Sequence, residues 1–123
     1  MPDSHVYDTV AFDVRDSTTM LFFARTSDDG DILDYLLLMR SIESNFDETF
    51  SIEANEQLIN GHEVLEEARL LGNTLTLTFN RPVEILGDVS VFVLAFDETE
   101  KNHDNMEAGA FRVLGDYLKG GTA

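Results

Sequence analysis

The strongest hydrophobic signal in the chain is the stretch from residue 34 to residue 40, Asp-Tyr-Leu-Leu-Leu-Met-Arg, in which five of seven residues are large and apolar. A strand with one solvated face would alternate apolar and polar side chains, and this stretch does not. Its length and its loop-forming flanks predict a central strand that is covered on both faces. We expect the other elements to be arranged around it.

Shorter patterns precede this stretch. Residues 6–14 alternate between apolar and polar side chains, with Asp8 as the exception on the apolar side, and predict a half-buried strand. Residues 18–25 are rich in β-branched and aromatic side chains and follow after a short turn, which predicts an antiparallel hairpin. Residues 27–31, Ser-Asp-Asp-Gly-Asp, predict a loop.

The middle of the chain is more polar. Residues 41–48 predict an exposed connection, and residues 50–54 alternate as a short strand does. Residues 55–61 end in Asn-Gly, a dipeptide suited to positive φ, and predict a turn region. In residues 74–79 two leucines and a phenylalanine alternate with three threonines, which is the clearest strand pattern in the sequence.

The segment 62–71 is ambiguous. Most of its residues are good helix formers, and its apolar residues are also compatible with helical spacing. However, only Gly72 and Asn73 separate it from the 74–79 strand, and a two-residue Gly-Asn link between extended segments is typical of a type II′ hairpin. We predict a strand here, with a helix of one or two turns as the alternative.

The last third predicts one more strand and a helix. Residues 81–87 contain Pro82 and predict a short connection, because proline belongs at the margin of a sheet. Residues 89–96 are apolar on both faces and predict a central strand beside 35–40 or 74–79. Residues 97–99 suit a helix start, and apolar residues then recur at helical spacing from Met106 to Leu118, before a Gly-Gly end.

These elements predict an α+β domain with a mostly antiparallel sheet of about six to seven strands and one C-terminal amphipathic helix packed on it. The 123 residues are enough for one core and too few for a second, so we expect a single domain over 1–123 with loose tails at 1–5 and 119–123. The chain has no cysteine, its N-terminus does not look like a signal peptide, and its longest apolar run is too short to span a membrane. These features favour a cytoplasmic location.

The charge is the unusual part of the composition. The formal net charge is −16 and the isoelectric point is near 4.2. Twelve acids lie between residues 28 and 67, and Arg40 is the only lysine or arginine among them. This balance argues against binding to nucleic acid or to an anionic membrane, since both need basic surface. It favours a basic partner, or serves only solubility, as in a salt-adapted organism.

No motif predicts catalysis, a metal site or a cofactor. His62-Glu63 begins like a zinc-protease helix, but position 66 is Glu66 and not the second histidine that the motif requires. Residues 28–31 lack the alternating ligands of a calcium loop, and the chain has no nucleophile elbow or phosphate-binding glycine loop. We therefore predict a protein that is not an enzyme. Arg40 suits an ion pair that orders the acidic loops or, alternatively, an interface anchor.

Residues 35–41, Tyr-Leu-Leu-Leu-Met-Arg-Ser, resemble the signature strand of the Imm-ten family of bacterial polymorphic-toxin immunity proteins. The similarity covers roughly residues 6–117, although Met39 stands where the family has glutamine and His62-Glu63 where it tends to have glycines. Further segments are similar in the same order: 50–57, 60–71, 74–79, 89–97 and 106–114. The resemblance implies a non-catalytic antidote that binds and blocks a cognate toxin protein.

Loops on a rigid scaffold are where binding residues concentrate, so we place the partner contact on the polar loops around 27–34 and 41–49. Two other classes remain open: a small domain that binds a metabolite or acts as a hydrolase, and a homodimeric structural module. The predicted partner-binding residues are six loop acids with two more as a rim: Asp28, Asp29, Asp31, Glu43, Asp47 and Glu48, with Glu53 and Glu56.

Overall fold

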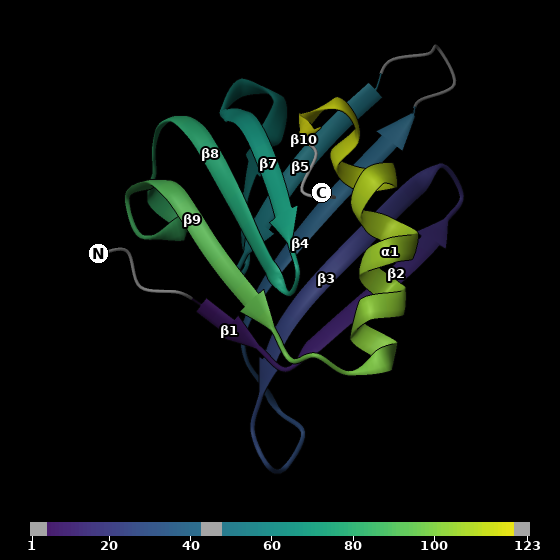
Figure 1. The fold of residues 1–123 in the computed structure, drawn as a ribbon. Coiled ribbons are helices and arrows are strands. Elements are labelled where there is room, and N and C mark those ends of the chain that lie inside the picture. The colour runs from purple at the N-terminus through teal and green to yellow at the C-terminus, as the bar shows by residue number, and fades with distance from the viewer. Residues whose placement is uncertain (1–4, 43–47, 120–123) are drawn as a thin grey trace.

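The structure is a computed structural model that describes residues 5–42 and 48–119. Within these ranges the chain forms two five-stranded sheets and one long helix (Figure 1). Sheet B has the order β2-β3-β4-β5-β6, and all its strand pairs are antiparallel. Its strands are β2 (Thr9–Arg15), β3 (Thr18–Thr26), β4 (Ile32–Ile42), β5 (Glu48–Ala54) and β6 (Gln57–Asn60).

Sheet A has the order β1-β9-β8-β7-β10, and its two outermost pairs, β1 with β9 and β10 with β7, are parallel. The helix α1 (Glu100–Leu114) follows β9. The strands of sheet A are β1 (His5–Tyr7), β7 (Leu65–Leu71), β8 (Thr74–Val83), β9 (Val89–Phe96) and β10 (Leu118–Lys119), and the short 3-10 turns are η1 (Gly61–Glu63), η2 (Glu84–Leu86) and η3 (Gly115–Tyr117).

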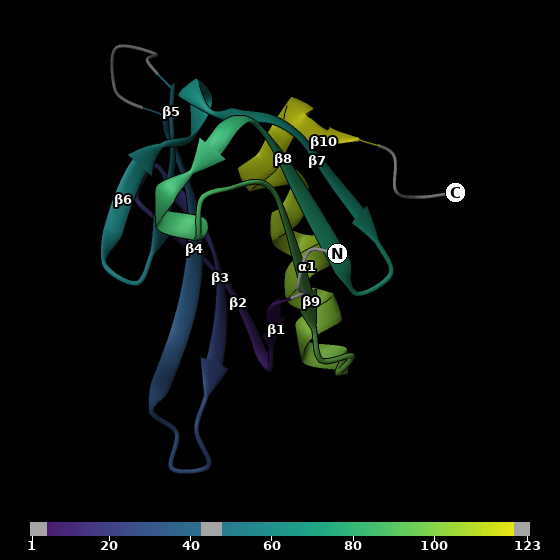
Figure 2. The ribbon, with the colours of Figure 1, turned by 90° about the vertical axis from the view of Figure 1, so that its left-hand side faces the viewer.

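The predicted class is confirmed: the fold is mostly antiparallel sheet with one C-terminal helix packed on it. The strand prediction for 62–71 is confirmed for residues 65–71, because β7 pairs with β8 through the two-residue link of Gly72, whose φ is +62°, and Asn73. Residues 62 and 63 lie instead in the 3-10 turn η1. The strands are more numerous than expected and form two sheets. The helix α1 lies against β2, β3 and β4, and sheet A lies beside the helix on the same side of sheet B (Figures 1 and 2).

The hydrophobic core therefore fills the space between the inner face of sheet B and its two covering layers. Sheet B contributes Leu21, Phe23, Leu36, Leu38 and Ile52, all with less than 1% of their surface exposed. Sheet A and α1 meet them with further fully buried side chains: Leu75, Leu77, Leu94, Val113 and Leu114.

β4 is central in its sheet, as predicted, but only one of its faces is covered. Leu36 and Leu38 point into the core, whereas Tyr35, Leu37 and Met39 are half-buried on the outer face. Both covering layers lie on the other side of sheet B (Figure 2). The prediction of two covered faces was wrong because a continuous apolar run does not distinguish a buried face from a half-exposed apolar one.

The predicted 6–14 strand is in fact two strands in different sheets. The chain turns from β1 into β2 at Asp8, and Tyr7 is buried while Val6 is 54% exposed. The carboxylate of Asp8 accepts hydrogen bonds from the backbone and side chain of Thr26 at 2.7 and 2.8 Å and from Thr9 Oγ1 at 2.7 Å. These hydrogen bonds lower the pKa of Asp8, and the bond from the Thr26 backbone lowers it most. They also hold the turn at Asp8 between β1 and β2.

Three other boundaries differ from the predictions. The 55–61 turn region contains β6, because Asn55 and Glu56 form a two-residue turn with φ of +49° and +73°. The 81–87 connection begins with the end of β8 and continues as a 3-10 turn. The helix ends before Gly115, whose φ is +56°, and not at the Gly-Gly pair.

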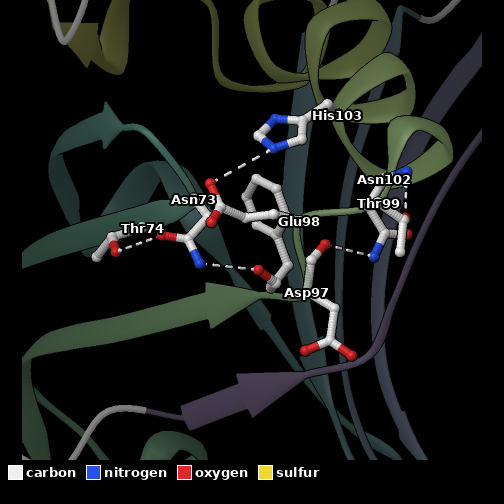
Figure 3. Close-up of polar contacts among 8 residues, drawn as sticks. Asn73, Thr74, Asp97, Glu98, Thr99, Asn102 and His103 are labelled. Atoms are coloured by element: carbon white, nitrogen blue, oxygen red, sulfur yellow. Dashed lines mark hydrogen bonds and ion pairs between the residues drawn. The ribbon is translucent and has the colours of Figure 1, made fainter.

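Asn102, near the start of the helix, is bonded to the chain at the end of β9 and at the start of β2; Figure 3 shows the bond to Asp97. Its side-chain oxygen accepts the backbone N–H of Val10 at 2.9 Å, and its side-chain nitrogen donates to the carbonyls of Asp8 and Asp97 at 3.0 and 2.9 Å. Thr99 caps the same helix end by accepting the backbone N–H of Asn102 at 3.1 Å. Nearby, Asn73 donates to the carbonyl of Phe96 at 3.0 Å and ties the β7–β8 turn to β9.

Arg40 fixes the other end of α1. Its Nε donates to the carbonyl of Val113 at 2.6 Å and its Nη2 to that of Leu114 at 3.2 Å, so the guanidinium caps the helix C-terminus. The guanidinium also lies over the ring of Phe50, 5.3 Å from its centroid. Its described contacts therefore give Arg40 a role in holding the helix on sheet B.

The two sides of β4 should differ in their contribution to stability. Leu38→Ala should lower the free energy of unfolding by about 2–5 kcal/mol, because it leaves a cavity in the core. Leu37→Ala removes a half-buried side chain and should cost about 1 kcal/mol. Urea unfolding of both variants measures the difference. An equal or larger cost for Leu37→Ala would contradict the single covered face.

Candidate protein-binding site

The β3–β4 hairpin extends beyond the rest of the fold in both views (Figures 1 and 2). Its loop closes tightly, because Ser27 N–H donates to the carbonyl of Asp31 at 2.8 Å and Gly30 N–H donates to that of Ser27 at 2.9 Å. The Ser27 hydroxyl also accepts the Asp31 N–H at 3.1 Å. This closure leaves the side chains of Asp28, Asp29 and Asp31 exposed at the tip.

Two large apolar side chains stand directly beside these acids. Ile32 is 56% exposed and Leu33 is 58% exposed, at the start of β4. The register between β3 and β4 shifts at Arg25 and Thr26, so the strands do not pair regularly there. Exposed aliphatic groups next to acids give this end of the molecule the mixed character of an interaction surface.

Tyr35 connects β4 to the neighbouring β5–β6 hairpin. Its hydroxyl donates to Glu53 Oε2 at 2.6 Å and accepts the backbone N–H of Glu56 at 2.8 Å. The hydrogen bond to the Glu53 carboxylate raises the pKa of Tyr35, because loss of the phenol proton would break it. On its ring face, Tyr35 lies against Phe22, with ring centroids 5.6 Å apart.

Asn55 makes a second bridge at the same place. Its side-chain oxygen accepts the backbone N–H of Tyr35 at 3.1 Å, and its side-chain nitrogen donates to Asp34 Oδ1 at 2.8 Å. Asn55 is the first residue of the two-residue turn, where asparagine tolerates positive φ. The turn and β4 are therefore held together by side-chain bonds in addition to the strand pairing.

Two hollows flank this bridge and share Asp34, Tyr35 and Asn55 in their walls. The outer hollow has a volume of about 460 Å³, and its remaining walls are Phe22, Ile32, Leu33 and Glu56. The inner hollow, of about 210 Å³, opens between the two sheets beside His5, Tyr7, Ala54, Ile85, Leu86, Gly87 and Phe92.

The predicted site residues do not form one group. Asp28, Asp29 and Asp31 lie at the hairpin tip, and Glu56 lines the outer hollow. Glu53 pairs with Leu37 at the middle of β4 and is joined to this region by the hydrogen bond from the Tyr35 hydroxyl. Glu48 pairs with Ile42 at the opposite end of β4, at ~3.3 Å per residue roughly 30 Å from the hairpin end of the strand and about 17 Å from Glu53. Glu43 and Asp47 lie outside the described residues.

We call the residues around the β3–β4 hairpin and the outer hollow the acidic end. Some of them are not among the partner-binding residues predicted from the sequence. Asp34 brings a further carboxylate, and Tyr35, in a strand predicted to be covered on both faces, lies half-buried on the outer face with its hydroxyl bonded to Glu53 and Glu56. The Asp34–Asn55 bond spans 21 residues, so no local pattern indicated it. The acidic end consists of Asp28, Asp29, Asp31, Asp34, Glu53 and Glu56, with the apolar Ile32, Leu33, Phe22 and Tyr35.

This arrangement suits the binding of cationic and apolar groups. The carboxylates supply negative potential, and the aromatic and aliphatic walls supply area for contact. Within residues 5–42 and 48–119, no three histidine, aspartate or glutamate side chains are placed to hold a metal ion together. In the same part of the chain, no helix has the length and apolar character needed to cross a membrane.

A third hollow, of about 460 Å³, lies near the C-terminal end of α1 and has a different character. Arg40 and Arg112 line it together with Phe111, which is 67% exposed. Arg40 already donates to two helix carbonyls, and Arg112 lies over the ring of Phe12 at 5.8 Å. These contacts explain the position of both arginines as packing of the helix end.

Comparisons with protein-family models, with curated proteins and with solved structures gave no match for this chain.

The Tyr35–Glu53 bond can be tested by titration. Absorbance titration of tyrosine ionisation in the parent protein and in Tyr35→Phe identifies the Tyr35 step as the one that the variant lacks. The pKa of this step should lie above 10, the value of an unperturbed tyrosine. Glu53→Gln removes the carboxylate and should move the Tyr35 step to lower pH. A Tyr35 step at or below pH 10 in the parent protein would show that the hydrogen bond is not formed.

Proposed function

We propose that this domain is a non-catalytic immunity protein that binds and neutralises a cognate bacterial toxin, with the acidic end as its contact surface. The observation that carries the proposal is the joint exposure of Ile32 and Leu33 beside the acids of a protruding hairpin. The resemblance to the Imm-ten family at residues 35–41 supports the choice of a toxin as the partner. A basic toxin surface would complement the charge.

The two kinds of side chain would act at different stages of binding. Acids at the tip steer a basic partner during encounter and raise the association rate. Apolar groups such as Ile32 and Leu33 give area that is removed from water once the complex forms, which slows dissociation. The rigid bridge at Tyr35 limits the ordering cost, since its hydroxyl is already bonded to two partners.

The proposal can be tested by co-expression with the product of the neighbouring open reading frame, scoring growth and co-purification. The triple variant Asp28→Lys, Asp29→Lys, Asp31→Lys should lose most of its protection, while its melting temperature holds or rises because repulsion in a chain of net charge −16 is relieved.

The matched control is Asp104→Lys, Glu107→Lys, Asp116→Lys, which makes the same change in net charge at exposed positions of α1 and η3. It should protect as well as the parent protein. Loss of protection by the control alone would move the contact to the helix. Full protection by both variants would rule out an acidic contact surface in either place.

The same partner gives a kinetic prediction. The association rate, measured by stopped-flow, should fall steeply between low and physiological ionic strength, because salt shortens the range of steering to about 8 Å. The dissociation rate should change much less. An association rate that does not depend on salt would remove electrostatic steering from the proposal.

A further inference from the structure

We propose that the outer hollow at the acidic end is a receptor for one arginine side chain of the partner. The inference deepens the proposed function, on which its biological role rests, by stating what the partner inserts. It starts from the walls of the hollow and not from the number of acids around it. An exposed acidic surface alone would attract counterions without fixing any of them in one place.

The first observation is the aromatic and aliphatic lining. Phe22 and Tyr35 project from neighbouring strands on the outer face of sheet B, with their rings 5.6 Å apart and inclined by 33°. Ile32 and Leu33 form another part of the wall. An arginine side chain can place its aliphatic stem against such groups and its planar guanidinium over a ring.

The second observation is where the charge lies within the lining. Asp34 and Glu56 both line the hollow, and Asp34 accepts a hydrogen bond from the side-chain amide of Asn55. Glu53 does not line the hollow, but its carboxylate accepts the hydrogen bond from the hydroxyl of Tyr35, which does. A guanidinium offers five donors in a fixed plane, which suits carboxylates beside an aromatic ring better than the compact ammonium of lysine.

The third observation is that several walls are held before any partner arrives. Tyr35 is bonded through its hydroxyl to Glu53 and to the backbone of Glu56, and Asn55 is bonded to Asp34. A site whose side chains are already fixed loses little conformational entropy on binding. The outer hollow can therefore select one side chain instead of adapting to many.

The test uses the whole protein and three blocked tripeptides, acetyl-Gly-Arg-Gly-amide and its lysine and norleucine counterparts. Amide chemical shifts are followed by NMR as each peptide is added. The arginine peptide should bind with a Kd on the order of millimolar, with shifts concentrated at Phe22, residues 32–35 and residues 55–56. The lysine peptide should bind more weakly, and the norleucine peptide should cause no saturable shift.

Two variants distinguish the contribution of the aromatic ring to arginine binding from that of the carboxylate charge. Phe22→Leu keeps an apolar wall but removes one ring, and should weaken arginine binding by about two- to fivefold. Glu56→Gln keeps the shape and the backbone bond to Tyr35 but removes one charge, and should weaken it as well. Glu107→Gln, an exposed acid on α1, is the control and should leave the Kd unchanged.

Three results would each overturn the inference: no saturable shift with the arginine peptide, shifts spread evenly over the acidic surface, or equal effects of Glu56→Gln and Glu107→Gln. These outcomes are independent of toxin neutralisation. If the peptide binds as expected but no toxin is neutralised, the receptor stands and the immunity role fails. If neutralisation occurs without peptide binding, the immunity role stands and the arginine receptor fails.

Discussion

The hydrogen bonds of Asn102 hold the point on which the rest of the architecture depends. Among the described residues Asn102 is the only buried polar side chain, and it is bonded to backbone groups of Asp8, Val10 and Asp97. At Asp8 and Val10 the chain passes from β1 of sheet A into β2 of sheet B, and at Asp97 it passes from β9 of sheet A toward the helix. Because a buried amide without partners is costly, these bonds favour one arrangement of the three elements.

With that junction fixed, the helix and sheet A share a single face of sheet B, and neither of them covers the other face. The described sheet edges are poor templates for strand addition. β1, β6 and β10 have three, four and two residues, and the backbone of Val10 in β2 is bonded to Asn102 and Asn105. In the proposed function, recognition of the partner therefore falls to side chains at the acidic end and on the outer face.

Local patterns in the sequence were sufficient for most elements. The alternation of 74–79, the Gly72 turn and the cap at Thr99 each depend on residues within a few positions, and each is found as expected. The predictions that failed depend on contacts between residues far apart in the sequence. The break between β1 and β2 at Asp8 depends on a hydrogen bond from Thr26, eighteen residues away, and the helix ends at Gly115, which lies beside Arg40 of β4.

The candidate site divides in the same way. The sequence by itself determined the excess of acids, the exposed Ser27–Asp31 loop and the absence of any recognisable catalytic motif, because charge and turn propensity are properties of short segments. Only the tertiary structure decided which acids lie near one another. It separated Glu48 from the acidic end and brought Tyr35 beside Asn55. The physical reason is that strand register sets cross-strand neighbours, and register is fixed by packing of the whole sheet.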